Sequence, residues 1–180
     1  MLAEYQNLSR WDCFRKERLI MSDSTLRLEP LPELHVAHVH GEVNHISEIG
    51  AMVEALFGNL IDRLDVAGVS PVGRNVRIYN GRSDESKIDV SVGVLLESGA
   101  APIAGLETVE LVAEARGATM RYHRLPVDIA DPWLTVDAFL EERGLESYGP
   151  YREIHYENGP GNRRIVELQC PVRDIGGACQ

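Results

Sequence analysis

Two parts of this chain are similar to each other, and that similarity limits the fold more than any single residue. The segment GVSPVGRNVRIYN (68–80), followed by KIDVSVGV (87–94), is matched by GLESYGPYREIHY (144–156), followed by RIVELQCPV (164–172). An internal repeat indicates two copies of one supersecondary unit. Two such units in one small domain are expected to meet about a pseudo-twofold axis. Because pockets tend to form where structural units meet, we predict a ligand site at the seam between the copies.

The spacing of apolar residues predicts the same order of elements in each copy: a strand pair, a helix and a hairpin. Helical spacing covers 46–64 and 128–143. Alternation predicts strands over 25–29, 33–40, 76–79, 88–94, 108–113, 118–125, 151–156 and 165–172. We therefore expect an α+β fold of two β-β-α-β-β-type repeats, with a curved antiparallel sheet, helices on one face and a ligand cleft on the other.

The repeat also divides the chain. Residues 1–24 lie outside it and are expected to form a partly disordered N-terminal extension. The domain is predicted over 25–173, with the first copy at 25–97 and the second at 106–173. Residues 174–180 are left as a C-terminal tail. Between the copies, residues 98–105 have mostly small side chains and include Pro102, and we interpret this segment as a hinge.

Charge and cysteine content narrow the class of partner. The chain has 180 residues, with 28 acidic against 18 basic side chains and a net charge of −10. Nucleic-acid binding modules usually carry a basic face, and none is evident here, so we expect no direct nucleic-acid contact. Three widely spaced cysteines without a CxxC motif, no signal-peptide core and no long apolar run favour a cytoplasmic protein away from membranes.

Polar residues alternate along the strands that close each copy. Glu153 and His155 share one strand face, and the neighbouring strand adds Glu167 and Gln169. The first copy offers Tyr79, with Arg77 beside it. If these side chains line an open concave face, carboxylates and aromatic rings together suit a flat, cationic or amphipathic ligand. The alternative is that both acids are solvated residues on an exposed strand face.

The two-copy pattern, the segment PYREIHYENGP and the closing VELQCPV resemble the GyrI-like, or AraC-type effector-binding, superfamily over residues 25–173. Such domains occur in multidrug-responsive transcription regulators and in stand-alone proteins. The resemblance implies that Glu153 lies at the bottom of a pocket lined with aromatic residues, with Glu167 as a second acid. His155 and Gln169 stand where relatives often carry aromatic residues, which implies a more polar or smaller pocket. Candidate wall residues are Trp133, Tyr122, Tyr79 and Tyr156.

Other chemistry has weaker support. The histidines of one short region, His35, His38, His40 and His45, include two on one strand face, as metal ligands would be, but polar strand and turn positions explain them as well. GxSxG, glycine-rich phosphate-loop and HExxH motifs are absent from the sequence. We expect neither a metal nor a cofactor.

The sequence therefore favours a stand-alone small-molecule-binding protein, without catalytic residues, that senses or sequesters a cationic or amphipathic compound. One alternative is a hydrolase of reactive small molecules on the same scaffold, with Glu153 and Glu167 as its acid and base. Another is a protein-binding module similar to a gyrase inhibitor, in which an acidic surface meets a large protein partner. Loss of dye binding in Glu153→Gln, consumption of a ligand, and binding to a large partner would distinguish the three.

Overall fold

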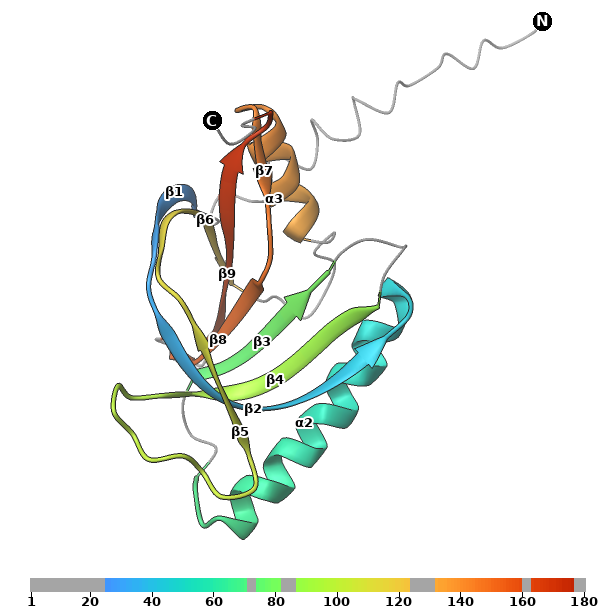
Figure 1. Cartoon of the computed structure of the whole chain (residues 1–180), viewed down its shortest axis with the longest axis vertical. Coiled ribbons are helices and arrows are strands. Elements are labelled where there is room, and N and C mark those ends of the chain that lie inside the picture. The colour runs from blue at the N-terminus through green and yellow to red at the C-terminus, as the bar shows by residue number, and fades with distance from the viewer. Residues whose placement is uncertain (1–24, 71–73, 82–86, 124–131, 160–162, 177–180) are drawn as a thin grey trace, which may run out of the picture.

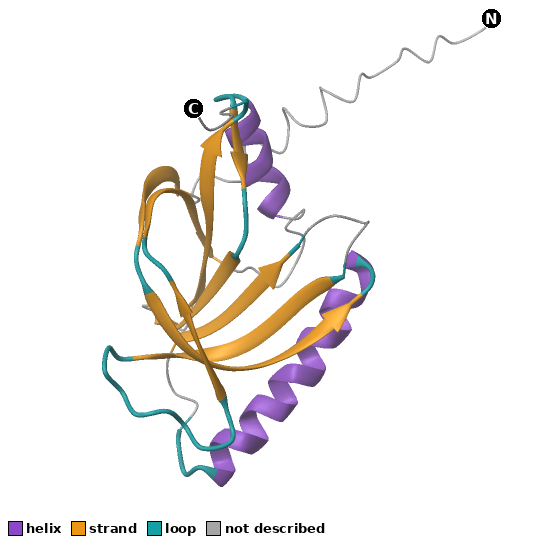
Figure 2. Ribbon diagram, viewed as in Figure 1, coloured by secondary structure: helices purple, strands orange, loops and turns teal. Residues whose placement is uncertain are grey.

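The computed structural model describes residues 25–70, 74–81, 87–123, 132–159 and 163–176, and the structural statements below concern these residues. In them, a curved and mostly antiparallel sheet carries two α-helices (Figures 1 and 2). The predicted α+β class with a curved antiparallel sheet is confirmed. The N-terminal extension and the start of the helix predicted at 128–143 lie outside the described residues.

The elements follow the predicted order, with two additions. The helices are α2 (Ile49–Val66) and α3 (Pro132–Glu141), and the one-turn 3₁₀ helix η1 (Ile46–Glu48) precedes α2. The strands are β1 (Thr25–Leu31), β2 (Leu34–Val43), β3 (Arg74–Asn80), β4 (Ile88–Leu96), β5 (Glu107–Leu111), β6 (Glu114–His123), β7 (Leu145–Ser147), β8 (Tyr151–Gly159) and β9 (Arg163–Asp174). The sequence patterns predicted neither the one-turn 3₁₀ helix η1 nor the short strand β7.

The strands lie in the order β1-β6-β9-β8-β3-β4-β2-β5, and β7 pairs with β9. Strands β3 and β8 are the two central neighbours. The first strand of each predicted copy pairs with the other copy, because β1 pairs with β6 and β5 pairs with β2. The order therefore reads the same from either edge when elements of one predicted copy are exchanged for those of the other.

Both helices pack on the same face of the sheet. The buried side of α2 consists of Val53, Leu56, Leu60 and Leu64, which recur at helical spacing. These residues belong to one cluster with Val90 and Val92 of β4, and α3 adds Val136 and Leu140 to that cluster. We call this the helix-side face. Along β2 and β4, α2 covers the sheet, while α3 lies beside β7 (Figure 1).

The opposite face of the sheet has a smaller apolar cluster, made by Val36, Val76, Ile78, Leu111 and Ile154. Beside it, the side chain of Arg152 on β8 is fully buried. Its Nη1 donates to the carbonyl oxygen of Pro32, and its Nη2 donates to that of Val112, each at 2.8 Å. Pro32 lies between β1 and β2, and Val112 lies between β5 and β6. One guanidinium thus holds both connections, each of which joins strands from opposite ends of the sheet.

No helix in the described parts of the chain is long and apolar enough to cross a membrane.

Candidate functional site

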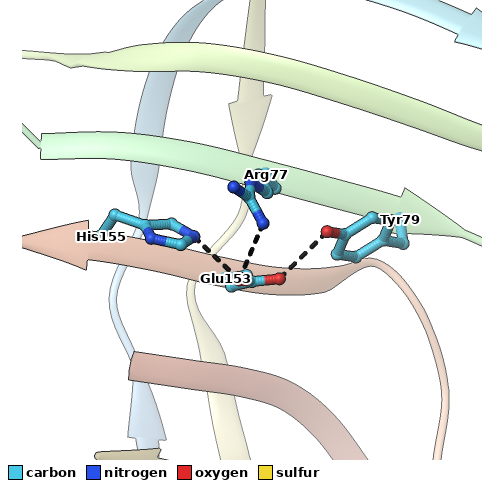
Figure 3. A network of polar contacts seen from close by, with 4 residues as sticks. All are labelled: Arg77, Tyr79, Glu153 and His155. Atoms are coloured by element: carbon cyan, nitrogen blue, oxygen red, sulfur yellow. Dashed lines mark hydrogen bonds and ion pairs between the residues drawn. The ribbon is translucent and has the colours of Figure 1, made fainter. Parts of the chain in front are cut away.

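A network of four polar side chains lies at the centre of the sheet, around Glu153 of β8 (Figure 3). Its Oε1 accepts from Nη1 of Arg77 at 3.2 Å and lies 2.8 Å from Nε2 of His155. Its Oε2 accepts from the hydroxyl of Tyr79 at 3.0 Å. We call these residues the Glu153 network. One carboxylate therefore contacts three side-chain groups.

The register of the central strands brings these residues together. Arg77 on β3 is directly opposite Glu153 on β8, and Tyr79 is opposite Tyr151. His155 lies two residues beyond Glu153, so alternation places it on the same face. The network therefore joins β3 from the first predicted copy with β8 from the second. The sequence separates Arg77 from Glu153 by more than 70 residues, and only strand pairing makes them neighbours.

The network is mostly shielded from solvent. Side-chain exposure is 13% for Glu153, 14% for His155 and 25% for Arg77. Burial alone raises the pKa of Glu153, but the hydrogen bond from His155, the charge of Arg77 and the Tyr79 hydroxyl outweigh burial and hold that pKa below its usual range. Burial and the nearby Glu153 charge raise the pKa of Tyr79, which keeps its proton. The carboxylate is thus ionised near neutral pH.

Glu153 lies on the helix-side face, so the prediction that it lies on the face opposite the helices is wrong. Across the β8–β9 pairing Glu153 is opposite Leu168, which belongs to the same cluster as the buried side of α2. Alternation along a single strand shows which residues share a face, but it does not show which face the helices cover.

Glu167 lies on the opposite face, so the structure separates the two predicted acids. Because Glu153 is opposite Leu168, the residue next to Leu168 along the chain, Glu167, points to the other side of the sheet. There the carboxylate accepts from Nε of Arg121, from the hydroxyl of Tyr156 at 3.1 Å and from Nε2 of Gln169 at 2.7 Å. Glu167 and Gln169 are buried, with 4% and 3% exposure. Glu167, Gln169 and Tyr156 therefore form a second network away from Glu153.

Besides Tyr79, two predicted wall residues lie on the helix-side face with Glu153. Tyr122 on β6 is opposite Val166, which is opposite His155 in turn. Trp133 on α3 is half-buried, and its ring meets that of Tyr151 edge to face with centroids 5.5 Å apart. Tyr151 was not among the predicted site residues, although its place two residues before Glu153 on the same strand was a usable signal.

The histidines of β2 are the candidates that the sequence offered as an alternative metal site. His38 and His40 share a face, with ring centroids 5.9 Å apart. Burial is the main cause that lowers the pKa of His38, and the nearby His40 ring lowers it further. Among the described residues, no group of three or more His, Cys, Asp or Glu side chains is placed to hold a metal ion. A hollow between α3 and β7 is lined by Asp137, Leu140, Glu141, Leu145, Glu146 and Ser147, and it includes no predicted site residue.

The Glu153 network can act on a small molecule in two ways. Its N–H and O–H groups can hold a polar group, and the rings of Trp133 and Tyr151 offer an apolar surface to the rest of a ligand. The ionised carboxylate beside His155 can also orient a polarised O–H or water.

Structural comparison finds a similar fold in solved proteins of low sequence identity. The C-terminal domain of EcmrR has a TM-score of 0.60 at 14% identity, over 85% of this chain and 99% of that chain. EcmrR in an EcmrR–DNA complex has a TM-score of 0.58 at 14% identity, over 92% of this chain and 62% of that chain. SAV2435, solved bound to tetraphenylphosphonium, has a TM-score of 0.56 at 12% identity, over 83% of this chain and 94% of that chain.

At these identities the comparison shows a shared fold. Sequence comparison with curated proteins gives no match. A family profile, described as the GyrI-like small molecule binding domain, matches residues 24–173, which include the whole described sheet except the last residue of β9. The chain therefore belongs to the family of GyrI-like small molecule binding domains.

Proposed function

We propose that this protein binds a small amphipathic molecule at the Glu153 network and acts as a sensor or a sequestering protein. The observation that carries the proposal is the position of an ionised, mostly buried carboxylate at the centre of the helix-side face, with the rings of Tyr151 and Trp133 on the same side. Structural neighbours support it, because SAV2435 was solved bound to tetraphenylphosphonium and EcmrR was solved in a complex with DNA.

The proposal includes the division of the domain into two copies and a cytoplasmic location. The symmetric strand order supports the first, and three widely spaced cysteines without a CxxC motif support the second. A protein partner, through which a sensor would pass on its signal, is also part of the proposal.

Fluorescence titration tests the site, because Trp133 packs against Tyr151 on the helix-side face. A panel of amphipathic compounds, charged and uncharged, is titrated into the protein while tryptophan emission is followed. We expect at least one compound to bind the parent protein, and we expect Glu153→Gln to change its affinity several-fold. The matched control is Glu167→Gln, which alters the network on the other face. Equal effects of the two variants, or no binding by any compound, would refute the site.

The hydrolase alternative, in the form that uses Glu153 and Glu167 together, is not supported. An acid and a base that act on one substrate must both reach it, and these two carboxylates lie on opposite faces of the sheet. The protein-binding alternative, based on the acidic surface, stays a prediction, and binding to a large partner that is insensitive to Glu153→Gln would support it.

A further inference from the structure

We infer that the ligand is an uncharged amphipathic molecule with a hydrogen-bond acceptor, and that Arg77 excludes lipophilic cations from the site. The inference rests on the proposed function, since it concerns the ligand of the same network. It differs from the sequence-based expectation, which allowed a cationic compound because Glu153 was considered without a partner.

The first observation is that the charge of Glu153 is already compensated. Nη1 of Arg77 lies 3.2 Å from Oε1 of Glu153, and both side chains are mostly shielded from solvent. Among the described residues, Glu153 is the only carboxylate paired with Arg77, and Arg77 is the only arginine or lysine paired with Glu153. A buried acid that awaits a cation would instead lack such a partner. The pair has no net charge.

The second observation concerns the geometry of an approaching cation. A cation in contact with the Glu153 carboxylate would lie close to the Arg77 guanidinium, because the two groups are within hydrogen-bond distance. Attraction to one and repulsion from the other are of similar size at such separations. The cation would then lose its hydration without a compensating gain, which makes its transfer to a shielded site unfavourable.

The third observation is that the carboxylate oxygens are occupied. Oε1 contacts Arg77 and His155, and Oε2 contacts Tyr79. The groups left to serve a ligand are therefore mainly donors. A guanidinium has five N–H groups, and the contact with Glu153 uses one of them. With 25% of its side chain exposed, Arg77 can donate to an acceptor oxygen of a bound molecule. The neighbouring rings of Trp133 and Tyr151 suit its apolar part.

Two probes of similar size, one charged and one uncharged, test the inference. Tetraphenylphosphonium is a lipophilic cation, and triphenylphosphine oxide is uncharged and has one strong acceptor oxygen. Isothermal titration calorimetry measures both affinities for the parent protein, for Arg77→Met, which removes the charge, and for Arg77→Lys, which keeps it. Circular dichroism confirms that each variant is folded, and Arg77→Gln replaces Arg77→Met if the latter is not.

We expect the parent protein and Arg77→Lys to bind the oxide at least about tenfold more tightly than the cation, which equals about 1.4 kcal/mol. In Arg77→Met the preference should invert, because Glu153 is then a buried carboxylate without a cationic partner. Cation binding by Arg77→Met alone would also support the exclusion. A parent protein that prefers the cation, or a ratio of affinities unchanged by Arg77→Met, would overturn the inference while leaving the proposed function intact. If neither probe binds the parent or any variant, the proposed function itself fails.

Discussion

Replacement of Glu153 by glutamine should lower stability near neutral pH and have a smaller effect in acid. Glutamine is nearly the same shape as glutamate, and its oxygen can still accept from Arg77 and His155, while its amide can donate to the oxygen of Tyr79. The variant therefore isolates the loss of charge from the loss of contacts.

The size of the effect follows from the three contacts. A hydrogen bond to a charged group contributes about 1.5–3 kcal/mol, against about 0.5–1.5 kcal/mol for a neutral pair. Three such differences of about 1 kcal/mol give an upper value of about 3 kcal/mol, which partial solvation of Arg77 reduces to about 2 kcal/mol. Glu153 has a folded-state pKa below its usual range, so its contribution is fully present above the unfolded-state pKa of about 4.3. It is lost as pH falls through the folded-state pKa.

Urea unfolding at several values between about pH 7 and pH 3.5 measures this contribution as the free-energy difference between parent and variant. The difference should be largest near neutral pH and shrink below about pH 4.3. Glu146→Gln is the matched control, because Glu146 forms an exposed ion pair with Arg173 at 2.7 Å, and exposed pairs contribute little. A difference for Glu153→Gln that does not change with pH, or one no larger than that of the control, would refute the assigned role of the charge.

Three further changes test the packing around the site, each by denaturant unfolding. Gly93→Ala should lower the free energy of unfolding by about 3 kcal/mol, because the new Cβ would lie 2.4 Å from a main-chain oxygen of β2. Gly58→Ala on α2, where a Cβ would have nothing within 4 Å, should raise that free energy by about 0.5–1 kcal/mol. Equal effects would contradict that close approach. Trp133→Ala should cost about 2 kcal/mol by removing the edge-to-face contact with Tyr151, and an unchanged midpoint would place the indole outside the core. Arg152→Lys should lower the free energy of unfolding by about 2 kcal/mol, since one ammonium cannot reach the carbonyls of both Pro32 and Val112. A variant as stable as the parent would show that this double contact is dispensable.

Most of the fold could be predicted because local patterns determine it. The helical spacing over 46–64, which includes Val53, Leu56 and Leu60, predicted α2, and the alternation over 165–172 predicted β9, whose Val166, Leu168 and Cys170 are buried. The three-residue strand β7 was missed because a segment of that length has no readable period.

The site could be predicted only in part, because register is a property of two strands and a pattern within one strand does not contain it. Glu153 and Glu167 each alternate as expected, yet their strands pair so that Glu153 is opposite Leu168, and the acids point to different faces. The same limit hid the direct pairing of Arg77 with Glu153, which changes the charge of the site from negative to neutral.

The exchange of first strands between the predicted copies has a consequence for how this molecule can be divided. A cut in the connection between β4 and β5 would leave the N-terminal fragment with β1 but without its partner β6, and the C-terminal fragment with β5 but without its partner β2. Arg77 and Tyr79 would belong to one fragment, and Glu153 and His155 to the other. Neither fragment could keep the network, so recovery of binding on mixing the two would report reassembly of the entire sheet.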